Sequence, residues 1–196
     1  MRNKKILMFS LSFLICALVL TIPISNSQPS WNGPVRLTNH NGEDAINIQG
    51  GCLALDSENK IHVVTYYAGQ IFYIYDNQGF INESMVTTVF SLHTEYRASP
   101  VIAVDSTGMK HIVYYSGTEE GYDLYYVHSL SGGGFSEPLR LTANTITDSF
   151  PQMVIDKNDV IHIVYQNAIL EKINETVSKI IITMQYINST DYENFS

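Results

Sequence analysis

The chain has 196 residues with 19 acidic and 11 basic side chains, a net charge of −8 at pH 7, and 45% hydrophobic residues. This acidic balance argues against nucleic acid and anionic membrane surfaces as partners, because both are bound through a basic footprint. Two cysteines in the whole chain do not make a disulfide framework, so stability must come from core packing.

Residues 1–27 have the pattern of a signal peptide. Three basic residues stand among the first five, residues 6–20 are apolar apart from two serines, and small residues follow at 25–27, as a signal peptidase requires. We therefore expect a secreted or extracellular protein. The alternative is an uncleaved membrane anchor, since a spanning helix needs about 20 apolar residues. Cleavage removes three basic residues and no acidic one, which takes the net charge from −8 to −11.

Beyond this segment one pattern occurs three times. Each copy has a short apolar run, then an aspartate, then a histidine six positions later. The pairs are Asp56 and His62, Asp105 and His111, and Asp156 and His162. The aspartates are 49 and then 51 residues apart, the interval at which four-stranded propeller blades repeat. The repeats are placed at about residues 31–88, 89–142 and 143–196.

The middle copy shows how one repeat becomes four strands. Val101–Val104 is a short apolar run with β-branched residues, typical of a strand buried on both faces. Asp105 to Gly108 supplies turn chemistry, because the aspartate accepts from backbone amides two residues on and glycine takes a positive φ. The other copies put Asn59 and Asp159 in or next to this glycine position. The remaining strands are predicted at 109–115, 122–129 and 135–142.

Residues 31–38 match residues 135–142 almost position for position, so the chain opens on a fourth, outermost strand. Residues 80–87 are a weaker copy of the same strand. After the third Asp–His pair, residues 179–187 are predicted as a third strand, and the last blade lacks its fourth. The sequence thus predicts an all-β fold, a β-propeller of four-stranded antiparallel blades with about three blades present.

The combination resembles the secreted β-propellers built from sialidase-like repeats, the group that includes Asp-box proteins. Its carriers are the three Asp–His hairpins, the Pro-x-Arg-Leu-Thr strands at 34–38 and 138–142, and the turn from Ser129 to Phe135. The family pattern has Asp where Ser131 stands and Trp where Phe135 stands, and the turns at 76–80 and 188–195 are expected to depart further from it. The resemblance implies the fold. Such turns are structural wherever they occur, so they do not indicate hydrolysis.

The length of the chain is compatible with two kinds of assembly. About fifty residues per blade give three blades and a part, and three blades cannot close a ring without exposed edge strands. One explanation is that the sequence is the front part of a longer protein. The other is a homodimer that completes a six-bladed ring, in which each opening strand completes the last blade of the other chain.

Strand parity predicts that the Asp turns share one face of the propeller and that ligand-binding loops share the other. Those loops are placed at 39–51, 89–99, 116–123 and 143–149. The ligand-binding candidates in them are Glu43, Asp44, Tyr96, Arg97 and Tyr122. The catalytic candidates are Glu95, Arg97 and Asp148, because glycoside cleavage needs one protonated and one ionised carboxyl group.

The three histidines of the repeats are predicted to be hydrogen-bonded blade residues and not metal ligands, since equivalent positions in successive blades are spread around a ring. We expect no metal and no cofactor. Cys52 is the one cysteine beyond residues 1–27, and we expect an inert core thiol.

The function that these features favour is a secreted or cell-surface binding module for a glycan or an extracellular protein, without catalysis. The alternative is a sialidase-like glycoside hydrolase or the front fragment of one. Asparagine sequons at Asn82, Asn174 and Asn188 are predicted glycosylation sites.

Overall fold

The computed structural model describes residues 37–38, 50–77, 80–88, 98–118, 121–173 and 178–196, all within one compact unit, Arg36–Ser196. In these ranges every regular element is a β-strand, and none is a helix long and apolar enough to cross a membrane. The predicted all-β class is confirmed.

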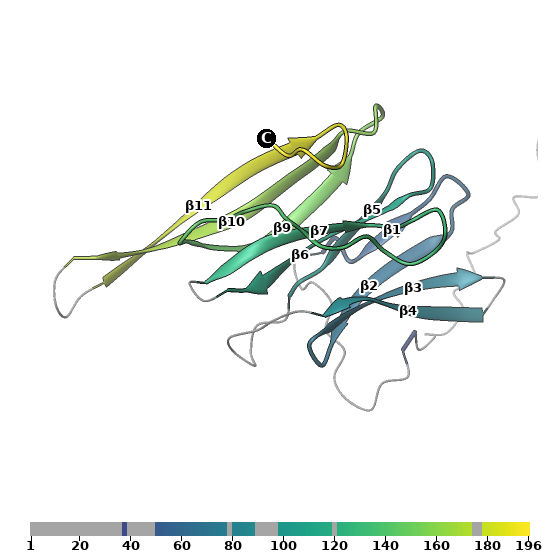
Figure 1. The fold of residues 1–196 in the computed structure, drawn as a ribbon, viewed down its shortest axis with the longest axis horizontal. Coiled ribbons are helices and arrows are strands. Elements are labelled where there is room, and N and C mark those ends of the chain that lie inside the picture. Colours follow the sequence, from purple (N-terminus) through teal and green to yellow (C-terminus); the bar gives the residue numbers. More distant parts are fainter. Residues whose placement is uncertain (1–36, 39–49, 78–79, 89–97, 119–120, 174–177) are drawn as a thin grey trace, which may run out of the picture. The chain divides into compact units, whose positions relative to one another are not determined.

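The strands form three antiparallel sheets in chain order (Figure 1). The first sheet contains β1 (Leu53–Leu55), β2 (Ile61–Tyr67), β3 (Gln70–Asn77) and β4 (Phe80–Thr88). The second contains β5 (Val101–Val104), β6 (Lys110–Gly117), β7 (Tyr122–His128) and β8 (Leu139–Arg140). The third contains β9 (Thr147–Ile155), β10 (Ile161–Lys172) and β11 (Ser178–Ser189). Each strand pairs with its sequence neighbour, so each sheet has the up-and-down order of a propeller blade.

The three sheets share one register. Their first two strands pair Ala54 with His62, Ala103 with His111, and Val154 with His162. Because cross-strand partners lie on the same face of a sheet, the repeated histidine marks one face of every sheet. We call it the histidine face, and the other side the opposite face.

One outer strand differs from the prediction, and another lies almost wholly outside the described residues. In the second sheet, residues 135–142 were expected to form one continuous strand, but the ladder with β7 is limited to Leu139–Arg140, and Phe135 makes an isolated bridge with Ser129. The break falls at Pro138, whose ring nitrogen cannot donate to the ladder. Of the predicted opening strand only Leu37 and Thr38 are described, and neither belongs to a strand.

Packing between the first two sheets joins unlike faces. The histidine face of the first sheet meets the opposite face of the second in one cluster of buried side chains. Its members include Val64, Ile71 and Tyr73 from the first sheet, and Ile102, Ile112, Tyr114 and Val127 from the second. Cys52 packs at the edge of this cluster as a free, half-buried thiol.

The second and third sheets meet in the same way. Val101, Val113, Leu124 and Tyr126 on the histidine face of the second sheet pack with Met153, Ile161, Ile163 and Tyr165 of the third. The Asp turns of these sheets also touch, since Asp159 accepts hydrogen bonds from the backbone N–H and hydroxyl of Ser106 at 2.9 and 2.6 Å. The two contacts follow one rule: the histidine faces of the first and second sheets are each covered by the opposite face of the next repeat.

We call the contact between the first and second sheets the first junction, and that between the second and third sheets the second junction. At the first junction, the close approach of two strands requires a glycine. The carbonyl of Gly51 accepts a hydrogen bond from the backbone of Ile102 at 2.8 Å. Gly51 has a φ of +81°, and a Cβ atom there would lie 2.9 Å from the Val101 side chain. A side chain at this position would push β1 away from β5, so glycine lets the two innermost strands approach.

Candidate functional site at the sheet junctions

The repeated aspartate is the centre of a tight turn. The Oδ1 atom of Asp105 accepts from the backbone N–H groups of Thr107 and Met109, both at 2.9 Å, and from the Thr107 hydroxyl at 2.7 Å. Asp56 and Asp156 make the same two backbone contacts in their own turns. Gly108 has a φ of +85°, and Asn59 and Asp159 have a φ of 61°. The predicted turn chemistry is confirmed in all three copies.

The second carboxylate oxygen of the turn holds the repeated histidine. Asp105 Oδ2 lies 3.2 Å from His111 Nε2, and His111 Nδ1 lies 2.7 Å from the Tyr126 hydroxyl. An ionised carboxylate can only accept, so Nε2 carries the proton and Nδ1 accepts from the tyrosine. We call this arrangement the Asp–His–Tyr bridge. The predicted hydrogen-bonded histidines are thus confirmed.

The bridge recurs in the other sheets with different tyrosines. His62 is 2.6 Å from the Tyr73 hydroxyl and 3.2 Å from Asp56 Oδ2. His162 is 2.7 Å from the Tyr186 hydroxyl, and its contact with Asp156 Oδ2 is longer, at 3.5 Å. Each tyrosine comes from the third strand of its repeat. The sequence analysis singled out the aspartate and the histidine but missed these tyrosines.

Burial sets the protonation state of the bridge. Desolvation is the main cause that lowers the pKa of His111 below its ordinary value, although Asp105 acts in the other direction. Burial alone would raise the pKa of Asp105, but hydrogen bonds from Thr107, Met109 and His111 outweigh it and the pKa is lowered. Desolvation raises the pKa of Tyr126. At neutral pH the bridge therefore consists of an ionised aspartate, a neutral histidine and a neutral tyrosine.

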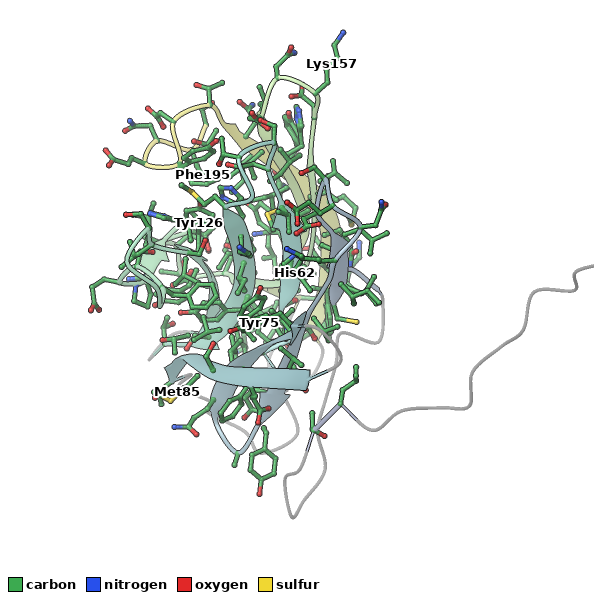
Figure 2. The ribbon with its side chains drawn as sticks, turned by 90° about the vertical axis from the view of Figure 1, so that its right-hand side faces the viewer. His62, Tyr75, Met85, Tyr126, Lys157 and Phe195 are labelled. Atoms are coloured by element: carbon green, nitrogen blue, oxygen red, sulfur yellow. The ribbon has the colours of Figure 1, made fainter. Side chains whose placement is uncertain are left out.

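At the second junction, a turn of the third repeat closes over this bridge. The ring of Tyr192 lies 4.8 Å from that of His111, and its hydroxyl donates to Asp105 Oδ2 at 3.2 Å. Phe195 lies 5.1 Å from Tyr126, measured between ring centroids, and Figure 2 shows the two side by side. A hollow of about 290 Å³ remains next to these rings.

At the first junction the equivalent turn leaves a larger hollow. Phe135 packs edge-on against Tyr73 at 5.6 Å, in the place that Phe195 takes at the second junction. The turns from Ser129 to Phe135 and from Ser189 to Phe195 have the same length, and Gly132 stands in the place of Tyr192. Without the tyrosine ring, a hollow of about 520 Å³ is open beside the bridge.

The large hollow combines aromatic rings with charged and hydroxyl groups. Its walls include His62 and Tyr75, which Figure 2 labels on the first sheet. The polar lining comes from Asp56, Lys60, Glu83, Ser84, Lys110 and Ser129, and the remainder from Tyr73, Leu130, Gly133, Gly134 and Phe135. Two basic and two acidic side chains face a space that is bounded by tyrosine rings. The lining is charge-balanced and combines aromatic and polar groups, as small-ligand pockets do.

One turn differs from the sequence-based expectation. The turn at 188–195 was expected to depart further from the Asp-box pattern than the turn around Ser131, but its Asp191 occupies the same place in its hairpin as Ser131. The Asp191 carboxylate accepts from the backbone N–H groups of Glu193 and Asn194 and from the Asn194 side chain, which lower its pKa to about 2. The two turns share their length of seven residues and their terminal serine and phenylalanine, and aligning them on these residues would have identified Asp191 as the equivalent of Ser131.

Two of the predicted site residues are buried in strands. Asp148, a catalytic candidate, is fully buried in β9 and accepts from the amides of Asn144 and Asn167 at 2.9 and 2.7 Å. Tyr122, a ligand-binding candidate, begins β7, and its ring packs edge-on against Tyr115. Both were placed in exposed loops by the sequence analysis, and the structure places them in the interior.

The other predicted site residues are not positioned. Glu43, Asp44, Glu95, Tyr96, Arg97 and Asn174 lie outside the described residues, and of Asn82 only the strand position in β4 is described. Asn188, the third sequon asparagine, lies in β11, and its amide is 3.4 Å from the Ser196 carbonyl. Within the described ranges no group of three His, Cys, Asp or Glu side chains is arranged to hold a metal ion.

Comparison with known proteins gives little. No family model matches the chain, and no curated protein matches it. Among solved structures, the endo-arabinase from Bacteroides thetaiotaomicron VPI-5482 is similar at 16% sequence identity and a TM-score of 0.45. The match covers 70% of this chain and 55% of that chain, so the chain spans about half the length of that structure. A likeness of this extent assigns no activity.

From the bridge we expect that removal of the Tyr126 hydroxyl lowers the stability of the fold. Tyr126→Phe leaves the buried Nδ1 atom of His111 without its donor, so the free energy of unfolding should fall by about 1–3 kcal/mol. Tyr75→Phe removes the same group from a half-buried ring at the hollow and should cost less than about 0.5 kcal/mol. Urea unfolding measures both. Equal losses in the two variants would contradict the role of the bridge.

The lowered pKa of His111 predicts acid sensitivity. Below about pH 6.5 the unfolded histidine binds a proton that the folded one resists. Stability should therefore be complete above this pH and fall as the pH drops toward 5, with Asp105 adding a further loss below about pH 4. The midpoint of thermal unfolding, recorded from pH 7 to 5, measures this slope.

His111→Gln serves as the matched variant for the acid experiment. It should unfold at a lower temperature at pH 7 but show a shallower decline from pH 7 to 5, because the titrating group is gone. A decline as steep as that of the unchanged chain would assign the acid sensitivity to other groups.

Proposed function

We propose that the chain is an extracellular β-propeller-type binding module that holds a saccharide in the hollow of the first junction and does not catalyse a reaction. The observation that carries the proposal is the hollow of about 520 Å³ with its mixed lining of aromatic and polar side chains. The extracellular location rests on the signal-peptide pattern of residues 1–27.

The lining suits a sugar for two reasons. The ring of Tyr75 is stacked on Tyr73 at 5.4 Å and presents an aromatic edge and face at the hollow, against which the apolar side of a sugar can pack. Lys60, Glu83 and Ser84 offer donors and acceptors for hydroxyl groups. The near balance of charge favours a neutral saccharide over a strongly anionic one.

Three of the described carboxylates have structural partners, which favours binding over catalysis at these acids. Hydrolysis of a glycoside needs one carboxyl group that stays protonated beside one that is ionised. Backbone hydrogen bonds, first that of Lys60, lower the pKa of Asp56, the acid of the turn at the hollow. Asp148 is held by two amides, and Asp123 is held by Arg140 and Thr142. Each of these three acids therefore has a structural partner.

The glycine at position 132 gives the sharpest test of the hollow. Gly132→Tyr places at the first junction the side chain that Tyr192 provides at the second. A Cβ atom at Gly132 meets nothing within 4 Å, so there is room for the new side chain. This variant should fold normally, and its affinity for the saccharide should fall at least about tenfold because the tyrosine fills the hollow. Tyr75→Ala should weaken binding by a similar factor, because it removes the aromatic ring against which the sugar packs. A glycan array followed by calorimetry with the best saccharide measures the affinity.

Met85→Ala is the matched control, since Met85 is exposed on β4 and does not line the hollow. Binding that survives Gly132→Tyr but is lost in Arg97→Ala or Tyr96→Ala would move the site to the predicted loops. Hydrolysis of fluorogenic glycosides that disappears in Glu95→Gln would establish the glycoside hydrolase instead. No saccharide binding by the exported chain would overturn the proposal.

A further inference from the structure

The histidine face of the third sheet is an exposed apolar surface. Its exposed members are Val154, Val164, Leu170, Ile180, Ile182, Met184 and Tyr186. Central positions of this face are buried where a further repeat follows. Val164 is 40% exposed, whereas its equivalent Val113 is 0% exposed, and Tyr186 is 52% exposed, whereas Tyr126 is 1% exposed. The third repeat thus has the residues of a covered face without a cover in the described structure.

The first two repeats show what kind of surface fits this face. In both, the cover is the opposite face of another repeat, and a phenylalanine from a turn of that repeat packs on the bridge tyrosine. Tyr73 receives Phe135, and Tyr126 receives Phe195. Within the described part of the chain Tyr186 contacts the ring of His162 and receives no such phenylalanine.

The first sheet presents a matching surface. On its opposite face Leu53 is 55% exposed, whereas the equivalent Ile102 of the second sheet is 3% exposed. Leu55 and Ile61 are exposed beside it. On the same face Val63, the cross-strand partner of Leu53, and Ile74, the partner of Val63, are buried, so the exposed part consists of β1 and the end of β2 next to the Asp56 turn. It is the same end at which Val154, Val164 and Tyr186 lie on the third sheet.

We propose that a second copy of the chain covers both surfaces. The histidine face of the third sheet in each copy packs on Leu53, Leu55 and Ile61 of the other, and repeats the stacking found twice within the chain. The contact is heterologous, because it joins two different surfaces. Two such contacts close a twofold ring of six sheets, which lies within the range of four to eight blades in propellers.

Two single substitutions test the pairing. Val64 and Ile102, the internal equivalents of Val164 and Leu53, belong to one buried cluster. Val164→Glu and Leu53→Lys each place one charge on one surface, and each should raise the dissociation constant of the dimer about tenfold or more. An equimolar mixture of the two variants should recover dimers, because the introduced glutamate of one variant then faces the introduced lysine of the other and the second contact is unchanged. Light scattering over a concentration series measures all four samples.

Thr183→Glu is the matched control, because Thr183 is exposed on the same strand, β11, but on its opposite face. It should leave the dimer intact, and circular dichroism should show that every variant is folded. The proposal is overturned if the unchanged chain is a monomer at all concentrations or forms open polymers. A dimer that Val164→Glu breaks and Leu53→Lys leaves intact would also overturn it, since that pattern belongs to a contact between two third sheets.

Discussion

The repeated aspartate turn is the contact on which each repeat depends, and the need of a buried carboxylate for hydrogen-bond donors is clearest at Asp105. Asp105 meets it with backbone amides of its own turn on one oxygen and with His111 on the other. The turn fixes the hairpin between the first two strands, and the histidine is hydrogen-bonded to Tyr126 on the third strand. One side chain therefore joins three strands and decides which face of the sheet is turned toward the next repeat.

The stacking of unlike faces follows from this arrangement and also creates the candidate site. The bridges of the first and second sheets lie at the rims of the two junctions, where a turn of the following repeat reaches over each of them. With Tyr192 in that turn the junction is nearly filled, and with Gly132 it opens into the larger hollow. The two junctions thus differ at one position in two turns of equal length, which is Tyr192 in one and Gly132 in the other.

The sequence predicted the Asp–His pairs, which follow from local spacing, but not the bridge tyrosines, whose positions depend on the register between strands. The Asp–His spacing is constant because both residues belong to one tight hairpin. The bridge tyrosines follow their histidines by 11, 15 and 24 residues, since the second hairpins differ in length, and no fixed spacing reveals them. Asp148 was assigned to a loop because β9 includes positions that the sequence pattern left outside a strand. Tyr122 fell within both a predicted loop and a predicted strand, and it belongs to the strand β7.

The state of the histidine rings tests the central role of the bridge most directly. Long-range proton–nitrogen NMR on the exported chain at pH 7 distinguishes the two ring nitrogens of His62 and His111. The account predicts neutral rings with the proton on Nε2 and with Nδ1 as the acceptor from tyrosine, a state that persists below pH 6.5. Rings protonated on Nδ1, or doubly protonated at pH 7, would contradict it.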